Sequence, residues 1–155
     1  MQVLNCTTPA NYFHALRRQM HRDFRKPLII MTPKSLLRNK HCVSNIDDFG
    51  KKNSFHRVLW DHAIDPKSKG FIKLKEAKKI RKVILCSGKV YFDLIEARQK
   101  LNINDVVIFR IEQLYPFPVK SLVKEIKQYA DSAKFFWCQE EPKNMGAWFS
   151  VRDYI

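Results

Sequence analysis

The fold is decided by residues 82–111, which read KVILCSGKVYFDLIEARQKLNINDVVIFRI. Lys82–Cys86 is an apolar run of strand length, and the Ser87-Gly88 pair after it is typical of a tight turn. Val90–Leu101 carries apolar residues at helical spacing, and Asp105–Ile111 is a second apolar, β-branched run. A strand, a helix and another strand in this order predict a right-handed βαβ unit with two parallel strands.

The same alternation continues toward the C-terminus. Pro116–Pro118 predicts a turn, and the apolar residues of Val119–Tyr129 recur at helical spacing. Lys134–Gln139 reads as a third strand, Pro142–Gly146 as a loop, and Gly146–Tyr154 as the opening of a further helix. We therefore expect a three-layer α/β domain with a mainly parallel sheet in this half of the chain.

The N-terminal segment predicts a shorter strand, helix and strand. Gln2–Asn5 is apolar, and Thr8 followed by Pro9 is typical of a helix N-cap. The helix should carry an apolar stripe of Ala10, Phe13, Leu16 and Met20. Leu28–Met31, enclosed by prolines, predicts a strand buried on both faces. Residues 32–79 lack a clear period, and we expect mainly a linker there, with a short helix or strand inside it.

The composition excludes a disordered chain, because its 155 residues include 11 Phe and 3 Trp. The 29 Lys and Arg residues exceed the 15 acidic residues by 14, which favours an anionic partner. Between Lys67 and Lys82, eight basic residues against Glu76 alone contribute +7 of this excess. Aromatic residues are scarce in this run, so a solvated linker face is favoured over a nucleic-acid interface.

Other sequence features restrict the environment and the chemistry. No apolar run reaches the length of about 18 residues that a membrane helix needs, and the start of the chain does not resemble a signal peptide. The five histidines show no zinc-binding spacing. The cysteines lack a CxxC spacing, and we expect free thiols in a reducing compartment for Cys6, Cys42, Cys86 and Cys138.

Three polar groups at predicted strand ends could carry chemistry. Ser87-Gly88-Lys89 opens a helix that could bind phosphate, but it matches neither a P-loop nor a dinucleotide-binding pattern, and an ordinary turn remains open. Glu140-Glu141 and Glu112 follow strands, where parallel sheets bind ligands. They could act as acid and base or hold a metal, or they could cap a loop and pair with Lys or Arg. No companion Ser or His motif decides between these alternatives.

Five stretches go beyond fold class: TPANYFHALRR at 8–18, RKPLIIMTPKSLLR at 25–38, CSGKVY at 86–91, RIEQLYPFP at 110–118 and WCQEEPKNMGAW at 137–148. In this order they resemble the C-terminal part of the decarboxylating component of the 2-oxoglutarate dehydrogenase complex. That family is transketolase-like and depends on thiamine diphosphate. The resemblance covers essentially the whole chain and is weakest from residue 48 to residue 79.

The resemblance implies a domain arrangement. Residues 1–44 would be the tail of a pyrimidine-binding domain, as a βαβ remnant, and residues 45–80 a basic linker. Residues 81–155 would be a truncated transketolase C-terminal-like domain. Because both ends of the chain look cut, we expect a fragment of a longer, homodimeric subunit.

The resemblance also implies a function for the parent. The parent would oxidatively decarboxylate 2-oxoglutarate in the tricarboxylic acid cycle and pass succinyl to lipoyl groups of the succinyltransferase component. Thiamine diphosphate and Mg²⁺ would be bound by segments absent here. We therefore expect no catalytic, cofactor-binding or metal-binding residue in this chain, which alone would be inactive. Its own role would be structural, in dimerisation, and regulatory.

One regulatory site follows from the same resemblance. Actinobacterial members bind acetyl-CoA as an activator, and Arg18 and Gln113 match positions of that site. Lys120 stands where the family has Arg, and Ser121 replaces a second Arg. We expect no nucleic acid or membrane partner, and a location in the bacterial cytoplasm or the mitochondrial matrix. The alternative is a stand-alone basic module that binds nucleic acid or a CoA-like anion.

Overall fold

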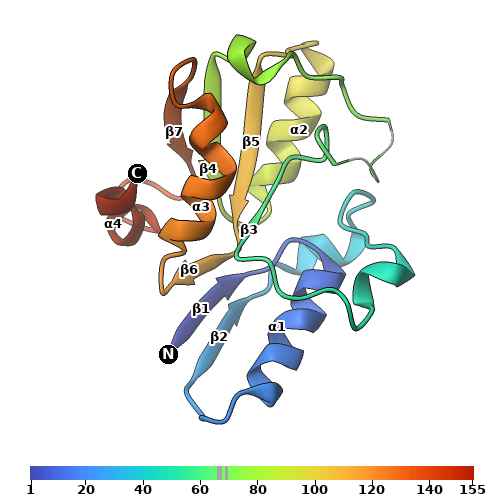
Figure 1. Ribbon diagram of the computed structural model, residues 1–155, viewed down its shortest axis with the longest axis vertical. Helices are drawn as coiled ribbons and strands as arrows, with labels where there is room; N and C mark the ends of the chain where they lie inside the picture. The colour runs from blue at the N-terminus through green and yellow to red at the C-terminus, as the bar shows by residue number, and fades with distance from the viewer. Residues whose placement is uncertain (66–67, 69) are drawn as a thin grey trace.

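The computed structural model describes residues 1–65, 68 and 70–155 as a mixed α/β structure with two sheets (Figure 1). The first sheet has the strand order β2-β1-β6 and the second the order β3-β5-β4-β7. The second sheet stands above the first in Figure 1, with helices α2 and α3 beside it. The predicted mixed α/β class is therefore confirmed.

The first sheet is built around a strand–helix–strand unit. Its strands β1, β2 and β6 span Gln2–Asn5, Leu28–Met31 and Gln113–Tyr115. Strands β1 and β2 are parallel, and β6 is antiparallel to β1. Helix α1, Pro9–His21, joins β1 to β2, and the Thr8 side chain caps it by accepting from the Asn11 N–H.

The second sheet is mainly parallel. Its strands β3, β4, β5 and β7 span Val58–Leu59, Lys82–Cys86, Val106–Ile111 and Lys134–Cys138. Strand β4 is central and pairs in parallel with β5 and β7, whereas β3 is antiparallel to β5. All six residues of β5 are buried, including Arg110, the one charged residue in an otherwise apolar strand.

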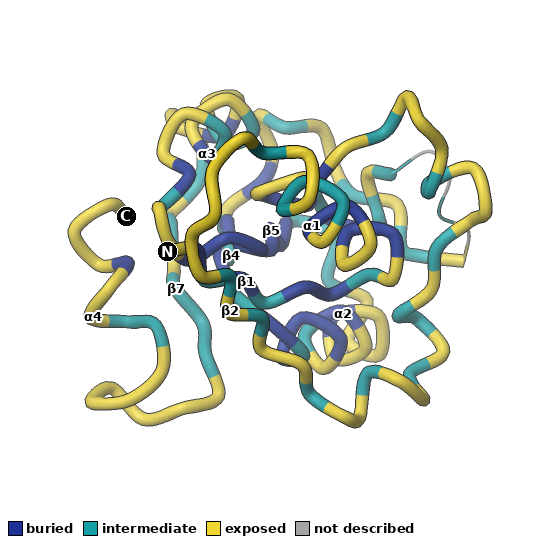
Figure 2. The backbone as a smooth tube through the Cα atoms, turned by 90° about the horizontal axis from the view of Figure 1, so that it is seen from below, coloured by how far each residue is buried: buried dark blue, intermediate teal, exposed yellow. Residues whose placement is uncertain are grey.

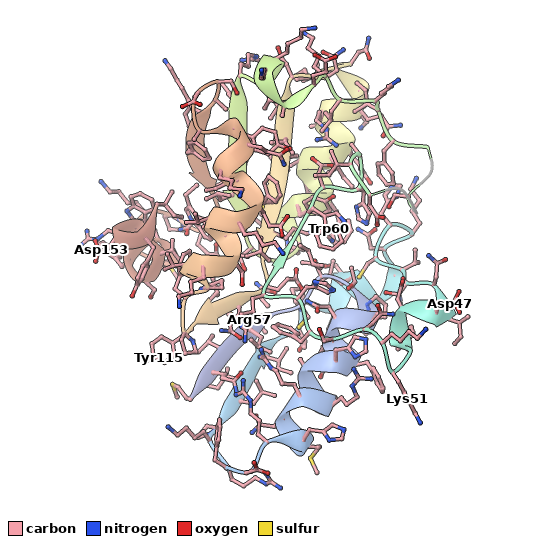
Figure 3. The ribbon with its side chains drawn as sticks, in the orientation of Figure 1. Asp47, Lys51, Arg57, Trp60, Tyr115 and Asp153 are labelled. Atoms are coloured by element: carbon pink, nitrogen blue, oxygen red, sulfur yellow. The ribbon has the colours of Figure 1, made fainter. Side chains whose placement is uncertain are left out.

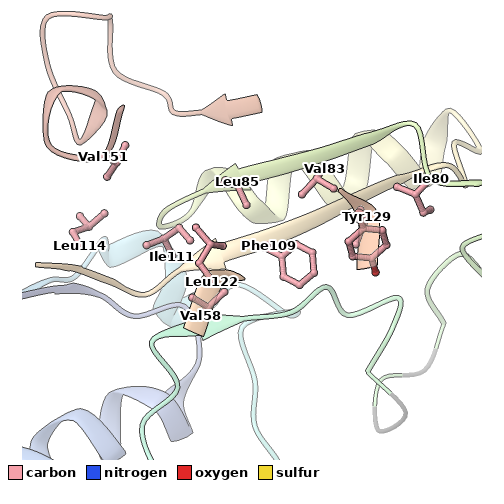
Figure 4. Packing of buried hydrophobic residues seen from close by; sticks show 11 residues of the cluster. Val58, Ile80, Val83, Leu85, Phe109, Ile111, Leu114, Leu122, Tyr129 and Val151 are labelled. Carbon is pink, nitrogen blue, oxygen red and sulfur yellow. The ribbon is translucent and has the colours of Figure 1, made fainter. Parts of the chain in front are cut away.

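Strand β4 divides its side chains between two apolar clusters. Val83 and Leu85 pack with Leu122 of helix α3, Val119–Ile126, in the cluster that Figure 4 shows. Ile84 and Cys86 pack instead against helix α2, Val90–Lys100. Because successive side chains of a strand point to opposite faces, the two helices cover opposite faces of the sheet. Strand β5 and parts of β1 and β4 are buried at the centre of the molecule, as the dark blue segments of Figure 2 show, whereas β2 and β7 have no fully buried residue.

Glu112 joins the two sheets. It lies between β5, which ends at Ile111, and β6, which begins at Gln113. Both strands are buried here, and Glu112 itself is 0% exposed. The chain therefore passes from one sheet to the other through a buried carboxylate.

One sequence prediction about a buried strand is wrong, and one predicted apolar stripe is mostly exposed. Strand β2 is not buried on both faces, because Ile29 and Met31 are exposed on the face opposite to Leu28 and Ile30. Helix α1 has the predicted period, but only Ala10 of the expected stripe is buried. The helix turns a mixed face toward the sheets because it buries polar side chains that bond to other segments, namely Asn11 and His14.

The stretch 45–80, predicted as a linker, contributes more than a connection. It supplies strand β3 and the buried Asp61, which pairs with Arg98 of α2. The remaining helices are short: η1 (Lys34–Arg38), η2 (Ile46–Phe49), η3 (Ala77–Lys79), η4 (Lys127–Tyr129), α4 (Trp148–Val151) and η5 (Arg152–Tyr154). No helix in the described part of the chain is both long and apolar enough to cross a membrane.

Candidate functional site

A basic pocket of about 650 Å³ opens where β6 meets the start of α3. Figure 3 labels two of its wall residues, Arg57 and Tyr115. We call this cavity the basic pocket and define it by its lining residues: Met1, Gln2, Arg22, Phe24, Lys26, Arg57, Gln113, Tyr115, Pro116, Phe117, Pro118, Val119, Lys120 and Ser121. Its volume lies within the range of 300–1,000 Å³ typical of small-molecule sites.

The charges around the basic pocket are all of one sign. Four cationic side chains line it, and no carboxylate of a described residue does. The cations are Arg22, Lys26, Arg57 and Lys120. An anion entering the pocket would therefore be attracted without competition from a lining acid, and the concave wall would strengthen the field.

Arg18 lies behind this wall, and its pKa is lowered by burial and by the positive charge of the wall. Its Nη2 donates to Oε1 of Gln2, a lining residue, at 2.7 Å, and its guanidinium lies 4.1 Å from the centre of the Phe55 ring. Burial, followed by repulsion from Arg22 and Arg57, lowers the pKa of Arg18 to about 10. The cations around the pocket thus repel one another, and a bound anion would relieve that repulsion.

The structure brings the sequence-predicted effector contacts to this place. Gln113 and Lys120 line the basic pocket, and Arg18 contacts it through Gln2. The Gln113 Nε2 donates to the Pro116 carbonyl at 2.7 Å, which leaves its buried Oε1 without a protein donor. Sequence reasoning missed the other three cations because they form no local motif: Arg22 follows α1, Lys26 lies in the loop before β2, and Arg57 precedes β3.

A second set of buried polar contacts ties α1 to the strand junction. The Glu112 carboxylate accepts from the Thr7 N–H at 2.9 Å and from Asn11 Nδ2 at 2.9 Å, and the Thr7 hydroxyl also donates to it. Arg110 donates to the same hydroxyl at 3.2 Å. Burial raises the pKa of Glu112, and the neighbouring Arg110 opposes that shift. Of the alternatives for Glu112, this geometry favours a structural contact.

A second cavity, of about 540 Å³, is lined by four of the five histidines and by Trp60, labelled in Figure 3. We call it the histidine pocket; its histidines are His14, His41, His56 and His62. Burial, followed by Arg110, lowers the pKa of His62 to about 4, so this ring is neutral at physiological pH. Among the described residues, no group of three or more His, Cys, Asp or Glu side chains is placed to hold a metal ion.

The other candidate groups are engaged in structural contacts. Gly88 has a φ of +75°, and a Cβ there would lie 2.5 Å from Asn5 Nδ2, so the turn packs closely against β1. Lys89 forms an ion pair with Glu140, which is the structural alternative expected for that carboxylate. A Cβ on Gly146 would lie 2.9 Å from Oε2 of Glu141, which places Glu141 against its own loop.

The predicted basic run reaches only partly into the described structure. Lys67 and Lys69 lie outside the described residues. Lys75 and Arg81 approach Asp105 at 3.8 and 3.0 Å, and the described lysines before Lys82 are exposed. This part of the run lies on a solvated surface at the amino ends of β4 and β5.

Comparison with known proteins matches two families along the chain. The family described as "2-oxoglutarate dehydrogenase C-terminal" matches residues 43–155, and "Transketolase, pyrimidine binding domain" matches residues 1–40. The 2-oxoglutarate dehydrogenase E1 components of Brucella anthropi and Brucella abortus are each 60% identical over all 155 residues, and that of Brucella ovis is 59% identical. The chain spans 15% of the length of each of these relatives. The chain therefore belongs to the 2-oxoglutarate dehydrogenase E1 family and corresponds to its C-terminal region.

Proposed function

We propose that the chain is the C-terminal part of a succinyl-transferring 2-oxoglutarate dehydrogenase. The parent would decarboxylate 2-oxoglutarate on thiamine diphosphate and pass succinyl to lipoyl groups of the succinyltransferase component. Identity of 60% along the whole chain carries this proposal. The parent would act as a homodimer in the bacterial cytoplasm or the mitochondrial matrix.

The role of this part would be structural. In this proposal, thiamine diphosphate and its Mg²⁺ would be bound by other segments of the parent. The residues matched to the pyrimidine-binding family contact the C-terminal region through Thr7, Asn11 and the buried Glu112. In this proposal residues 1–44, 45–80 and 81–155 are the pyrimidine-binding tail, the connecting segment and the C-terminal domain.

The parent assignment is tested by size and by activity. An antibody to residues 137–148 should detect, in the source cells, one band several times larger than 18.4 kDa. The full-length protein should release CO₂ from 2-oxoglutarate only when thiamine diphosphate and Mg²⁺ are supplied. A stable band near 18.4 kDa, or a full-length protein inactive with every 2-oxo acid supplied, would refute the proposal.

We also propose that the basic pocket binds acetyl-CoA as an effector. The proposal rests on the four cationic side chains that line the pocket, where no described residue contributes a carboxylate. Arg57 and Lys120 would contact phosphate groups, and the free Oε1 of Gln113 would accept from a ligand N–H. Arg18 would act from behind by orienting Gln2.

Calorimetric titration of the full-length protein with acetyl-CoA tests this site. Because a hydrogen bond to a charged group contributes about 1.5–3 kcal/mol, Arg57→Ala should weaken binding by about 10-fold or more. Lys120→Ala should do the same, whereas Lys124→Ala, on the exposed part of α3, should leave the affinity unchanged. Absence of heat with the unmodified protein would end the effector proposal without affecting the family assignment.

A further inference from the structure

Two cysteines lie side by side at the carboxyl ends of neighbouring parallel strands. Cys86 ends β4 and Cys138 ends β7, and the pairing register of the two strands places them directly opposite each other. The alternation of side chains puts both on the face that α2 covers, since Cys86 belongs to the α2 cluster and Cys138 packs against it. They are 52 residues apart in the sequence, so no local sequence motif indicates that they form a pair.

The spacing of the strands brings the two thiols within reach of one bridging atom. Adjacent strands lie about 4.8 Å apart, and residues in register on one face project in the same direction. That separation falls within the Cα range of about 4.4–6.8 Å that two directly bonded sulfurs require. The other cysteines lack this geometry: Cys42 donates to the Thr7 carbonyl at 3.2 Å, and Cys6 packs in a different cluster.

The two thiols differ in access. Cys86 is 0% exposed, and its Sγ lies 3.6 Å from the Phe109 carbonyl oxygen, to which it donates. Cys138 is only half-buried, on a strand that lies at one end of the sheet order. Its neighbour on the same face, Phe136, is 42% exposed, so this face of β7 is only partly covered. A reagent can therefore reach Cys138 first and close onto Cys86 second.

The surroundings hold the pair in place. Lys89, just after β4, forms an ion pair with Glu140, just after β7, so the two strand ends are connected beyond the cysteines as well. Burial raises the pKa of both thiols, and few thiolates are present at neutral pH. Thiolate-dependent alkylation of either cysteine by itself is thereby disfavoured.

We propose that Cys86 and Cys138 form a vicinal dithiol site for trivalent, sulfur-seeking electrophiles such as monosubstituted arsenic(III). With phenylarsine oxide, two As–S bonds form while two S–H bonds and both bonds between arsenic and oxygen break. The oxygen leaves with the two thiol protons as one molecule of water. Nothing is oxidised or reduced, and arsenic keeps its phenyl group as a third substituent.

The experiment uses the complete reduced chain, phenylarsine oxide as the probe and intact-mass spectrometry as the readout. One phenylarsenic group should add per chain with the loss of two free thiols. A dithiol competitor should remove it, whereas an equal concentration of a monothiol should not. Because closing the second bond is intramolecular, Cys138→Ser should weaken binding by about 100-fold or more. Cys86→Ser should do the same.

The remaining cysteines provide the matched control. A Cys6→Ser and Cys42→Ser double variant should bind the probe as tightly as the unmodified chain. Cys138 is half-buried, so its Ser variant should keep the circular dichroism and melting temperature of the unmodified chain even if Cys86→Ser does not fold. Tight binding by Cys138→Ser, or loss of binding in the Cys6 and Cys42 double variant, would overturn the proposal.

Discussion

The buried ion pair between Asp61 and Arg98 should dominate the attachment of segment 45–80 to the second sheet. The Arg98 side chain is 3% exposed and Asp61 is 0% exposed. Arg98 donates to Asp61 through both terminal nitrogens, one of them at 2.8 Å, and Nη1 also donates to the Val106 carbonyl at 3.1 Å. Asp61 accepts in addition from the backbone N–H groups of Ile108 and Ala63, each at 2.9 Å.

Asp61→Asn keeps the shape of this side chain but leaves the Arg98 charge buried without a counter-charge. Removing one partner of a buried pair costs about 3–5 kcal/mol. We therefore expect Asp61→Asn to lower the free energy of unfolding by at least about 3 kcal/mol. Urea unfolding at pH 7, followed by tryptophan fluorescence, measures the change.

Asp105 provides a matched control for this prediction. It also pairs with an arginine, Arg81, at 3.0 Å, but that arginine is exposed. Exposed pairs contribute about 1 kcal/mol or less, so Asp105→Asn should have a small effect. Equal effects of Asp61→Asn and Asp105→Asn would refute the reasoning that burial makes the Asp61 pair important.

Three further changes test the buried polar groups and the tight turn. Burial raises the pKa of Glu112 in the folded state above the ordinary carboxyl value of 4.5. As the pH rises from 4.5 through the folded pKa, the unmodified chain should therefore lose stability relative to Glu112→Gln. Parallel pH dependences of the two free energies of unfolding in urea titrations would contradict this. The lowered pKa of His62, about 4, means that unfolding takes up a proton as the pH falls from 6.5 toward 4. Stability should drop there by up to about 1 kcal/mol per pH unit, and a His62→Gln variant with the same slope would be the contrary result. Gly88→Ala should lower the melting temperature, at a cost of about 1–3 kcal/mol, because φ is +75° and its Cβ would meet Asn5. Adding Asn5→Ala to this variant should recover only the part of the lost stability that comes from the steric clash. Full recovery of the melting temperature would show that the positive φ of residue 88 has no energetic cost for alanine.

The three parallel strands of the second sheet could be predicted because each is a separate apolar run. Strand β4 has the predicted range, and β5 and β7 are each one residue shorter than predicted. Strand β6 could not be predicted, since its three residues between Glu112 and Pro116 are too few for a periodic signal. Strand β3 has two residues, which is too short for any periodic signal.

Contacts between distant segments account for the rest of what the sequence did not show. Asp61 and Arg98 are 37 residues apart, and Thr7 and Glu112 are 105 apart. The spacing of apolar residues in a helix or strand indicates which face is buried only when the buried face is itself apolar. Helix α1 buries Asn11 and His14 instead, so its apolar period pointed to the wrong face.

The net charge of +14 favours an anionic partner, and the structure places the cations in two different settings. The basic run around Lys75 and Arg81 is densest in the sequence, yet its described residues are mostly exposed and partly neutralised by Asp105. Salt screens such charges over about 8 Å at physiological ionic strength. Arg22 and Arg57 are few by comparison, but they line a concave wall, and after burial they are the next causes that lower the pKa of Arg18 behind it. Repulsion among cations at a partly buried position is a stronger sign of an anion site than a high density of solvated lysines. A bound anion relieves that repulsion, and its attraction to the cations strengthens as water leaves.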